Sequence, residues 1–193
     1  MDHPKRVALF GGTFDPVHLG HLAIARAARE RLHLDRVLFI PCRQSPHKDN
    51  PALAGNNQRI HMLELALAAE PWALVSGVEL QFPSPSYSWI TAEAMAEIYP
   101  RSQLFWLMGA DQWSVIESWS RPEHLAGIVD FIVHDRDGLI NPRTGFRTHF
   151  ISGSHPASAH EIRSRAPDTL PAEWLHPAVA DFIRSCNLYG CRS

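Results

Sequence analysis

The sequence is poor in cysteine, lacks long apolar runs and carries almost no excess charge. Only three of the 193 residues are cysteines, and Cys42, Cys186 and Cys191 do not have the spacing of zinc ligands. No stretch is apolar for long enough to form the core of a signal peptide or a membrane-spanning helix. Together these absences favour a protein of the cytoplasm with reduced thiols.

The weak net charge excludes a further group of partners. Eighteen Lys and Arg residues against twenty Asp and Glu residues leave a net charge of −2 at pH 7. This charge gives no electrostatic basis for binding a nucleic-acid polymer or an anionic membrane. We expect one domain over residues 1–193, large enough to fold without a disulfide or a metal. Whether the chain forms a homo-oligomer is left open.

What the sequence does contain is a regular alternation of strand-like and helix-like segments. The expected strands cover residues 5–10, 36–41, about 74–80, 103–108, 128–133 and 149–152. The expected helices cover residues 19–32, 57–69 and about 88–99, with one more from near 158 and another over about 172–187. This order predicts an α/β fold with a Rossmann-like, doubly wound, mainly parallel sheet flanked by helices. A small helical part, about 158–193, is expected to close the chain.

In such a sheet, ligands bind outside the carboxyl ends of the strands. The segments expected to meet there are 11–21, 42–50, 109–119 and 134–163. In the first of them, Gly11 and Gly12 let the backbone approach a ligand closely because neither has a Cβ atom. Pro16 stiffens the turn, and a helix is expected to begin near Val17 or His18. The unbonded amides and positive dipole end of that helix favour a phosphate group.

Two histidines stand at the start of this helix. His18 and His21 are three residues apart and share one helical face, while Gly20 keeps space between them for a substrate. From these residues alone, an ordinary glycine turn with two exposed histidines and a zinc-binding pair both stay open. Neither GxxxxGK[ST] nor GxGxxG is present, which disfavours a P-loop ATPase and a dinucleotide-binding dehydrogenase.

The whole run from Gly11 to His21, GGTFDPVHLGH, resembles the signature of the HxGH nucleotidylyltransferase superfamily. Within that superfamily the sequence resembles the bacterial nicotinate-nucleotide adenylyltransferases, which make deamido-NAD from nicotinate mononucleotide and ATP. The likeness covers nearly the whole chain. It includes Pro46-His47-Lys48, Gln58-Arg59, Glu79-Leu80, Pro85-Ser86-Tyr87-Ser88, Gly109-Ala110-Asp111, Trp119, Arg136 and Leu188-Tyr189.

The resemblance implies a set of active-site residues. The catalytic residues would be His18, His21, Lys48 and Arg163. ATP would contact Gly11, Gly12, Thr13, Phe14, His18, Gly20, His21, Ser158, Ile162 and Arg163. Nicotinate mononucleotide would contact Thr13, Asp15, Lys48, Tyr87, Ser88, Gly109, Asp111, Trp119 and Arg136. Mg²⁺ would arrive with ATP, and no separate protein metal site is implied.

Side-chain chemistry refines some of these roles. The indole of Trp119 suits stacking on a flat pyridine ring, whereas Trp106, inside a strand, is expected in the core. Asp111, at a strand end, is expected to bind a ribose hydroxyl, with capping of the next helix as the alternative. Asp15 is expected to fix the turn rather than to react. Backbone amides around residues 87–88 would hold the nicotinate carboxylate.

One motif departs from the family. The late ISxTxIR pattern stands here as Ala157-Ser158-Ala159-His160-Glu161-Ile162-Arg163, so an alanine replaces an isoleucine and His160 a threonine. Asp137 also replaces the proline common after Arg136. Ala157 and His160 motivate one alternative, a nucleotide-binding protein that has lost catalysis. Two other acceptors, nicotinamide mononucleotide and phosphopantetheine, are also alternatives, and the second is disfavoured by segments 46–48, 79–88 and 109–119.

Overall fold

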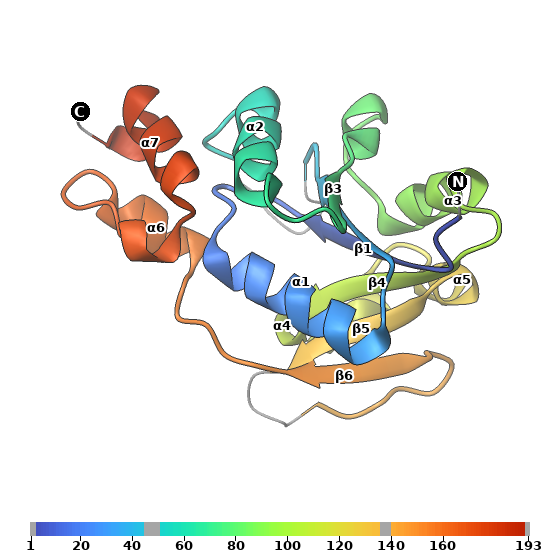
Figure 1. Ribbon diagram of the computed structural model, residues 1–193. Helices are drawn as coiled ribbons and strands as arrows, with labels where there is room; N and C mark the ends of the chain where they lie inside the picture. The colour runs from blue at the N-terminus through green and yellow to red at the C-terminus, as the bar shows by residue number, and fades with distance from the viewer. Residues whose placement is uncertain (1–2, 45–50, 136–139, 192–193) are drawn as a thin grey trace.

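Six parallel strands form the centre of the protein, in the order β3-β2-β1-β4-β5-β6 (Figure 1). The computed structural model describes residues 3–44, 51–135 and 140–191. The strands are β1 (Arg6–Gly12), β2 (Arg36–Pro41), β3 (Ala73–Val75), β4 (Gln103–Gly109), β5 (Asp130–Asp135) and β6 (Thr148–Ser152). The expected doubly wound α/β fold is confirmed, with a sheet that is parallel throughout.

Helices cover both faces of this sheet. They are α1 (Leu19–Leu32), α2 (Asn56–Leu67), α3 (Ser88–Ile98), α4 (Ala110–Ser114), α5 (Pro122–Ile128), α6 (Ala159–Arg165) and α7 (Pro177–Ser185). Single 3-10 turns are η1 (Val78–Gln81), η2 (Ile116–Ser118), η3 (Ala172–Trp174) and η4 (Leu188–Gly190). Apolar residues of α1, α2, α6 and α7 pack into one core cluster, and those of α3, α4 and α5 into the other.

The side chains of β1 show why the core has two layers. Ala8 and Phe10 belong to the cluster under α1 and α2, while Val7 and Leu9 belong to the cluster under α3 and α5. Successive side chains of a strand point to opposite faces, so a buried strand needs apolar residues at every position. The continuous apolar run of this strand is therefore explained by burial on both faces.

The register brings the carboxyl ends of neighbouring strands to one edge. Gly12 pairs with Pro41, Gly109 pairs with His134, and Asp135 pairs with Ser152. Everything that follows these strands therefore begins at the same side of the sheet. The active-site segments are expected at that edge.

Two expected elements are shorter than the periodicity suggested. The strand expected near 74–80 ends at Val75, and η1 follows after Gly77, because β3 pairs with β2 over only three positions. The helix expected over 172–187 divides into η3 and α7. Pro177 begins α7, since proline lacks an amide hydrogen and fits a first helical turn rather than a helix interior. The short helix α5 was not expected. A helix capped by Asp111 was considered, and α4 is that helix, but its N-cap residue is Gly109 and Asp111 lies within its first turn.

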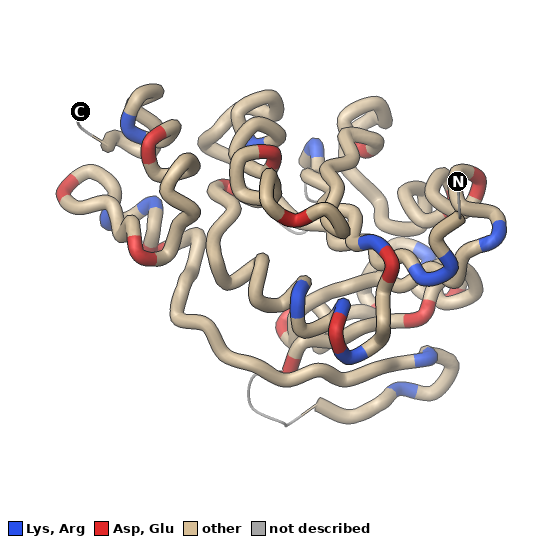
Figure 2. The backbone as a smooth tube through the Cα atoms, viewed as in Figure 1, with Lys and Arg blue, Asp and Glu red and all other residues tan. Residues whose placement is uncertain are grey.

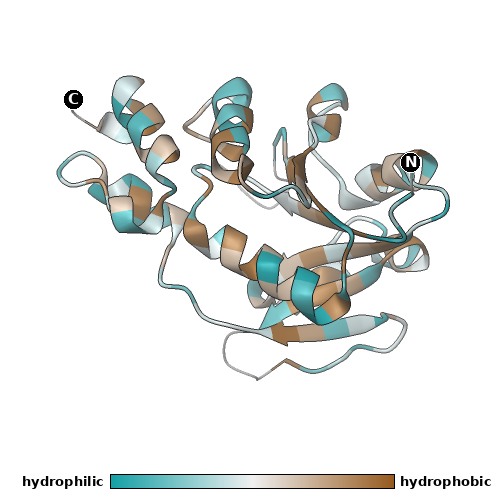
Figure 3. Cartoon of the chain, in the orientation of Figure 1, coloured by the Kyte–Doolittle hydropathy of each residue, from teal (hydrophilic) through white to brown (hydrophobic). Residues whose placement is uncertain are grey.

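Charged residues occur along the whole chain, and a few of them, such as Arg59 and Glu79, are buried. On the backbone tube, Lys and Arg are intermixed with Asp and Glu (Figure 2). Hydrophobic residues line the sheet and the helix sides turned toward it (Figure 3). Within the described residues, no helix is both long and apolar enough to cross a bilayer.

Candidate active site

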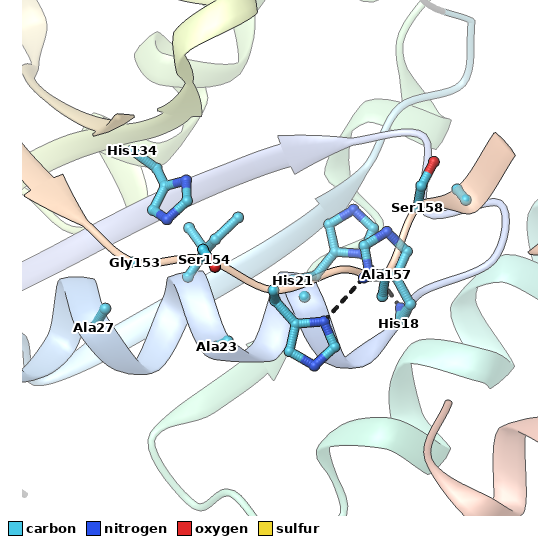
Figure 4. A pocket seen from close by; sticks show the side chains of 13 residues that line it. His18, His21, Ala23, Ala27, His134, Gly153, Ser154, Ala157 and Ser158 are labelled. Atoms are coloured by element: carbon cyan, nitrogen blue, oxygen red, sulfur yellow. Dashed lines mark hydrogen bonds between the residues drawn. The ribbon is translucent and has the colours of Figure 1, made fainter. Parts of the chain in front are cut away.

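The connection from β1 to α1 brings the two signature histidines together. His18 is the N-cap residue of α1, and its ring stacks on that of His21 with 3.8 Å between ring centroids and 29° between planes (Figure 4). The backbone amide of His18 donates to Nδ1 of His21 over 3.2 Å. A neutral imidazole whose Nδ1 accepts a hydrogen bond carries its proton on Nε2. His21 can therefore act as a donor through Nε2.

Gly20 is needed for the stacked pair itself. A Cβ atom at this position would lie 2.9 Å from Nδ1 of His18 and 3.4 Å from the carbonyl oxygen of Ala157. Any side chain would displace the His18 ring from its place above the first helical turn. The space expected beside Gly20 for a substrate is thus partly filled by the imidazole of His18.

A buried cation supports the turn from below. Arg59 of α2 is 0% exposed, and its Nη1 donates to the carbonyl oxygen of Thr13 over 2.7 Å. Its Nη2 donates to the carbonyl oxygen of Cys42 and to Oδ1 of Asn56, each over 2.7 Å. One guanidinium therefore ties the end of β1 to the end of β2 and to α2. Its charge also favours anions near the turn.

Asp15 fixes the same turn from the other side. Its buried carboxylate accepts hydrogen bonds from the amides of Leu53 (2.8 Å) and Ala54 (3.0 Å) and from the Tyr189 hydroxyl (2.8 Å). Arg163 Nη1 donates to the carbonyl oxygen of Asp15 over 2.6 Å. Burial first, and then the charge of Asp15, raise the pKa of Tyr189 far above its usual value, so this hydroxyl keeps its proton. Residues from three distant segments thus anchor one turn.

A first cavity lies at the carboxyl ends of β1 and β4, with a volume of about 270 Å³. We call it the strand-end pocket. Its floor and walls combine apolar rings with polar groups from several elements. It is lined by Phe10, Gly11, Gly12, Thr13, His21, Cys42, Glu79, Ser86, Ser88, Trp106, Met108, Gly109, Asp111, Gln112 and Trp119.

A second cavity of about 310 Å³ lies between α1 and the chain that follows β6. We call it the loop pocket. Figure 4 shows His134 and Gly153 toward one end, His18 and Ser158 toward the other, and Ala157 beside the histidine pair. Its lining comprises His18, Gly20, His21, Ala23, Ile24, Ala27, His134, Gly153, Ser154, His155, Ala157, Ser158 and Ala159. His21 lines both cavities, so the pockets meet at the start of α1.

Most residues expected to bind ligands lie in these two cavities. The strand-end pocket contains Gly11, Gly12, Thr13, His21, Ser88, Gly109, Asp111 and Trp119. The loop pocket contains His18, Gly20, His21 and Ser158. Lys48 and Arg136 lie outside the described residues, as does Asp137.

Five other expected residues line neither cavity. Phe14 and Ile162 are almost fully buried in the core, and the Phe14 ring packs edge to face on that of His21 with 5.0 Å between centroids. Asp15 and Arg163 are engaged with each other beneath the turn, and Tyr87 is the N-cap residue of α3. The fixing role expected for Asp15 agrees with its hydrogen bonds, whereas its expected contact with the mononucleotide stays a prediction.

Sequence reasoning gave no role to several residues that the fold brings to the cavities. Trp106 was expected in the core, and it is buried, but it also lines the strand-end pocket and meets Trp119 edge to face at 6.3 Å. Glu79 and Ser86 had been noted only as parts of the resemblance. His134 stands at the end of a strand, which is the one signal that could have indicated it.

Comparison with known families and proteins identifies the family of the chain. Residues 9–165 match the cytidylyltransferase-like family. A protein of Methylacidiphilum infernorum named "Probable nicotinate-nucleotide adenylyltransferase" is 37% identical over 194 residues, covering 95% of this chain and 92% of that protein. One of the same name from Shouchella clausii is 35% identical and covers 96% and 97% of the two chains.

Solved structures show the same fold at lower sequence identity. The nicotinic acid mononucleotide adenylyltransferase of Plasmodium falciparum, complexed with NaAD, superimposes with a TM-score of 0.80 at 19% identity. The match covers 97% of this chain and 98% of that one. The same protein complexed with APC gives a TM-score of 0.79 at 18% identity over the same shares.

Proposed function

The chain belongs to the cytidylyltransferase-like family and, within it, to the nicotinate-nucleotide adenylyltransferases, and from this premise we propose the reaction and its residues. The protein transfers the adenylyl group of ATP to nicotinate mononucleotide and releases pyrophosphate, forming nicotinate adenine dinucleotide for NAD biosynthesis. The observation that carries the site assignment is the position of His21, which lines both cavities. A group that touches both substrates belongs where the new bond forms.

We assign ATP to the loop pocket and the mononucleotide to the strand-end pocket. The 5′-phosphate of the acceptor carries close to two negative charges at neutral pH because its second pKa is about 6. One of its oxygens can therefore attack the α-phosphorus of ATP without a general base. The bond from the α-phosphorus to the bridging oxygen breaks as the new phosphorus–oxygen bond forms, and pyrophosphate leaves with that electron pair. No covalent enzyme intermediate is needed.

Positioning and electrostatic stabilisation then account for catalysis. Nε2 of His21 is the donor we assign to the oxygens of the α-phosphate, with His18 beside it. The first amides of α1, those of Gly11 and Gly12 and the hydroxyl of Thr13 support the same charge. The stacked rings are held by Gly20 and by the cap hydrogen bond, so the donors are in place before the substrate binds.

The departing pyrophosphate needs cationic partners. We propose that Arg163 and Lys48, the latter outside the described residues, supply this positive charge, and that the hydroxyl of Ser158 adds a neutral hydrogen-bond donor. We also propose that ATP enters with Mg²⁺. In the described part of the chain no three His, Cys, Asp or Glu side chains are grouped as metal ligands. A magnesium ion that stays on the phosphates and its own waters requires few protein ligands.

On the acceptor side we propose that Trp119 stacks on the pyridine ring and that Asp111 holds a ribose hydroxyl. Backbone amides at Tyr87 and Ser88 are assigned to the nicotinate carboxylate, since they begin helix α3. Arg136 is proposed as a further contact outside the described residues. We place the reaction in the cytoplasm, with neither a nucleic-acid polymer nor a membrane as partner, and leave the homo-oligomer as a hypothesis.

A mononucleotide comparison tests this function. The protein would be incubated with ATP and Mg²⁺ in two separate reactions, one with nicotinate mononucleotide and one with nicotinamide mononucleotide. Pyrophosphate release would be followed in both. We expect kcat/KM to be at least about tenfold higher for the nicotinate form, which corresponds to about 1.4 kcal/mol in the transition state. A preference for the amide would refute the acceptor assignment, and no turnover with either would refute the function.

A further inference from the structure

A buried acid stands in the wall of the strand-end pocket. Glu79 of η1 is only 4% exposed, yet it is one of the residues that line this cavity. Its Oε1 accepts a hydrogen bond of 2.8 Å from the hydroxyl of Thr91, which is fully buried in α3. Its Oε2 is buried and makes no hydrogen bond of ordinary geometry with the described residues.

The surroundings of this carboxyl favour its neutral form. Burial raises the pKa of Glu79, and the hydroxyls of Thr91 and Ser86 and the charge of Arg59 reduce that rise without cancelling it. The guanidinium of Arg59 is directed instead at the carbonyls of Thr13 and Cys42 and at Asn56. The buried carboxyl therefore has no hydrogen-bonded cationic partner among the described residues.

The acceptor itself adds negative charge to the same cavity. Nicotinate mononucleotide has an anionic ring substituent and an anionic phosphate, and a second ionised group nearby makes ionisation of a carboxyl more costly. Among the described residues, the other titratable groups that line the cavity are His21 from α1, the thiol of Cys42 after β2, and the exposed Asp111 of α4. None of these three is a permanent cation, and the two cations assigned to the acceptor, Lys48 and Arg136, lie outside the described residues.

The carboxyl of Glu79 lies close to the amino-terminal end of helix α3. Thr91 lies in the first turns of this helix, so the carboxyl of Glu79 sits beside the positive end of the helix dipole. That dipole stabilises a negative charge, so it works, like the charge of Arg59, against the neutral form that burial favours. A neutral Glu79 leaves this stabilisation to the carboxylate of the ligand, whose assigned partners are the amides at residues 87–88.

We propose that Glu79 is a specificity-determining residue that keeps its proton while the acceptor is bound, so that a neutral carboxyl forms the wall beside an anionic pyridine substituent. This inference rests on the proposed function. Below the pKa of Glu79 the wall is neutral, and nicotinate mononucleotide binds with its ring carboxylate ionised. Above that pKa the ionised Glu79 repels the ring carboxylate, so KM for nicotinate mononucleotide rises with pH. The neutral amide of nicotinamide mononucleotide escapes this repulsion.

The variant Glu79→Gln tests the proposal because glutamine is neutral at every pH and nearly the same shape. We would measure kcat and KM for nicotinate mononucleotide from pH 6 to pH 9 in the wild type, in Glu79→Gln and in Glu97→Gln. Glu97 is an exposed acid of α3 and serves as the matched control. Titration of the phosphate and the histidines is common to all three proteins and cancels in the comparison.

We expect the KM of the wild type and of Glu97→Gln to rise roughly tenfold over the pH interval in which Glu79 ionises, above the usual range of a carboxyl, with kcat little changed. In Glu79→Gln this rise should be absent, and KM at pH 7 should stay within about threefold of the wild type. The proposal is overturned by a rise that persists in Glu79→Gln, by the absence of a rise in the wild type, or by a KM for Glu79→Gln more than about tenfold higher at pH 7.

A binding measurement on the wild type tests the proposal even if the Glu79→Gln variant does not fold. Calorimetric titration with nicotinate mononucleotide, in two buffers of different ionisation enthalpy, reports the protons taken up on binding. We expect net uptake above the pKa of Glu79 and smaller uptake with nicotinamide mononucleotide. Equal proton uptake with both ligands would overturn the proposal. Turnover of nicotinate mononucleotide by the wild type is judged separately, so failure of the proposed function is distinguishable from failure of this inference.

Discussion

The strand-end pocket is enclosed by side chains from many separate segments, whereas the loop pocket lies between α1, His134 and one stretch of chain, residues 153–159. Around the first, buried hydrogen bonds connect the walls. Thr91 bonds Glu79, and the Ser86 hydroxyl accepts from the amide of Arg43. Along 153–159, the amide of Ala157 donates to Nδ1 of His155 within the same stretch of chain.

If the two substrates occupy the pockets as proposed, this difference predicts that they are recognised in different ways. A cavity whose walls are held by buried hydrogen bonds can discriminate between closely related rings. A ring substituent that does not match the fixed polar groups of the wall leaves those groups without a hydrogen-bond partner. A cavity made by one exposed stretch beside a helix start binds mainly through phosphate and backbone contacts. We therefore expect substitutions in the strand-end pocket to change acceptor selection, and those around the loop pocket to change ATP affinity modestly.

The largest effect is expected where the pockets meet. His18→Ala should lower kcat by about 10²–10³-fold, the usual loss when one preorganised donor to a developing charge is removed. KM for either substrate should change less, because the pocket walls stay in place. His3→Ala, an exposed histidine beyond the amino-terminal end of β1, is the matched control and should leave kcat unchanged. Steady-state rates of pyrophosphate release measure both, and an unchanged kcat for His18→Ala would refute the catalytic role.

Next in size is a change confined to the strand-end pocket. Trp119→Ala should raise KM for the mononucleotide by about 10–100-fold, since stacking of a base on an aromatic ring contributes about 1–3 kcal/mol. KM for ATP should stay within about twofold. Trp119→Phe keeps an aromatic face and should recover part of the loss. If both KM values rose equally, the indole would be supporting the fold rather than the acceptor.

A smaller effect, shared by both substrates, is expected beneath the turn. Tyr189→Phe removes a hydroxyl donor from buried Asp15, which should lower the free energy of unfolding by about 1–3 kcal/mol. Because this turn leads into His18 and His21, kcat should fall for every substrate pair without a change in acceptor preference. Urea unfolding and kinetics would be compared with Tyr99→Phe, at the far end of α3. A shift in acceptor preference would contradict the anchoring role.

The smallest effect is expected at the residue that departs from the family motif. His160 is exposed and lines neither cavity. His160→Thr should therefore change KM for ATP by less than about threefold and leave the acceptor unaffected. An improvement in ATP affinity of more than tenfold would show that the lost hydroxyl had been a phosphate contact.

Much of the fold follows from local pattern. The helix over 19–32 and the strand over 36–41 have the bounds that periodicity indicated, because the first has a buried face at helical spacing and the second is apolar throughout. The double glycine and the pair His18 and His21 likewise stand within one run of eleven residues. Features whose partners are near in sequence can be predicted from sequence.

The hydrogen bonds that hold the turn of the site in place could not be predicted from local sequence pattern. Arg59 reaches the carbonyl of Thr13 across 46 positions, and Tyr189 reaches Asp15 across 174. No period or spacing relates such residues before the chain is folded. The burial of Glu79 also depends on segments that are distant in sequence. The neutral state proposed for this residue requires that elements before and after it in the chain exclude water from its carboxyl.

The sequence by itself determined the α/β alternation, the histidine pair at a helix start and, through its resemblance, the family. These depend on which residues are neighbours along the chain. Only the tertiary structure decided that two cavities meet at His21, that Asp15 and Arg59 anchor the turn, and that an acid stands in the wall of the strand-end pocket. Those facts depend on the strand order and register, which bring distant segments to one edge of the sheet and exclude water from the groups between them.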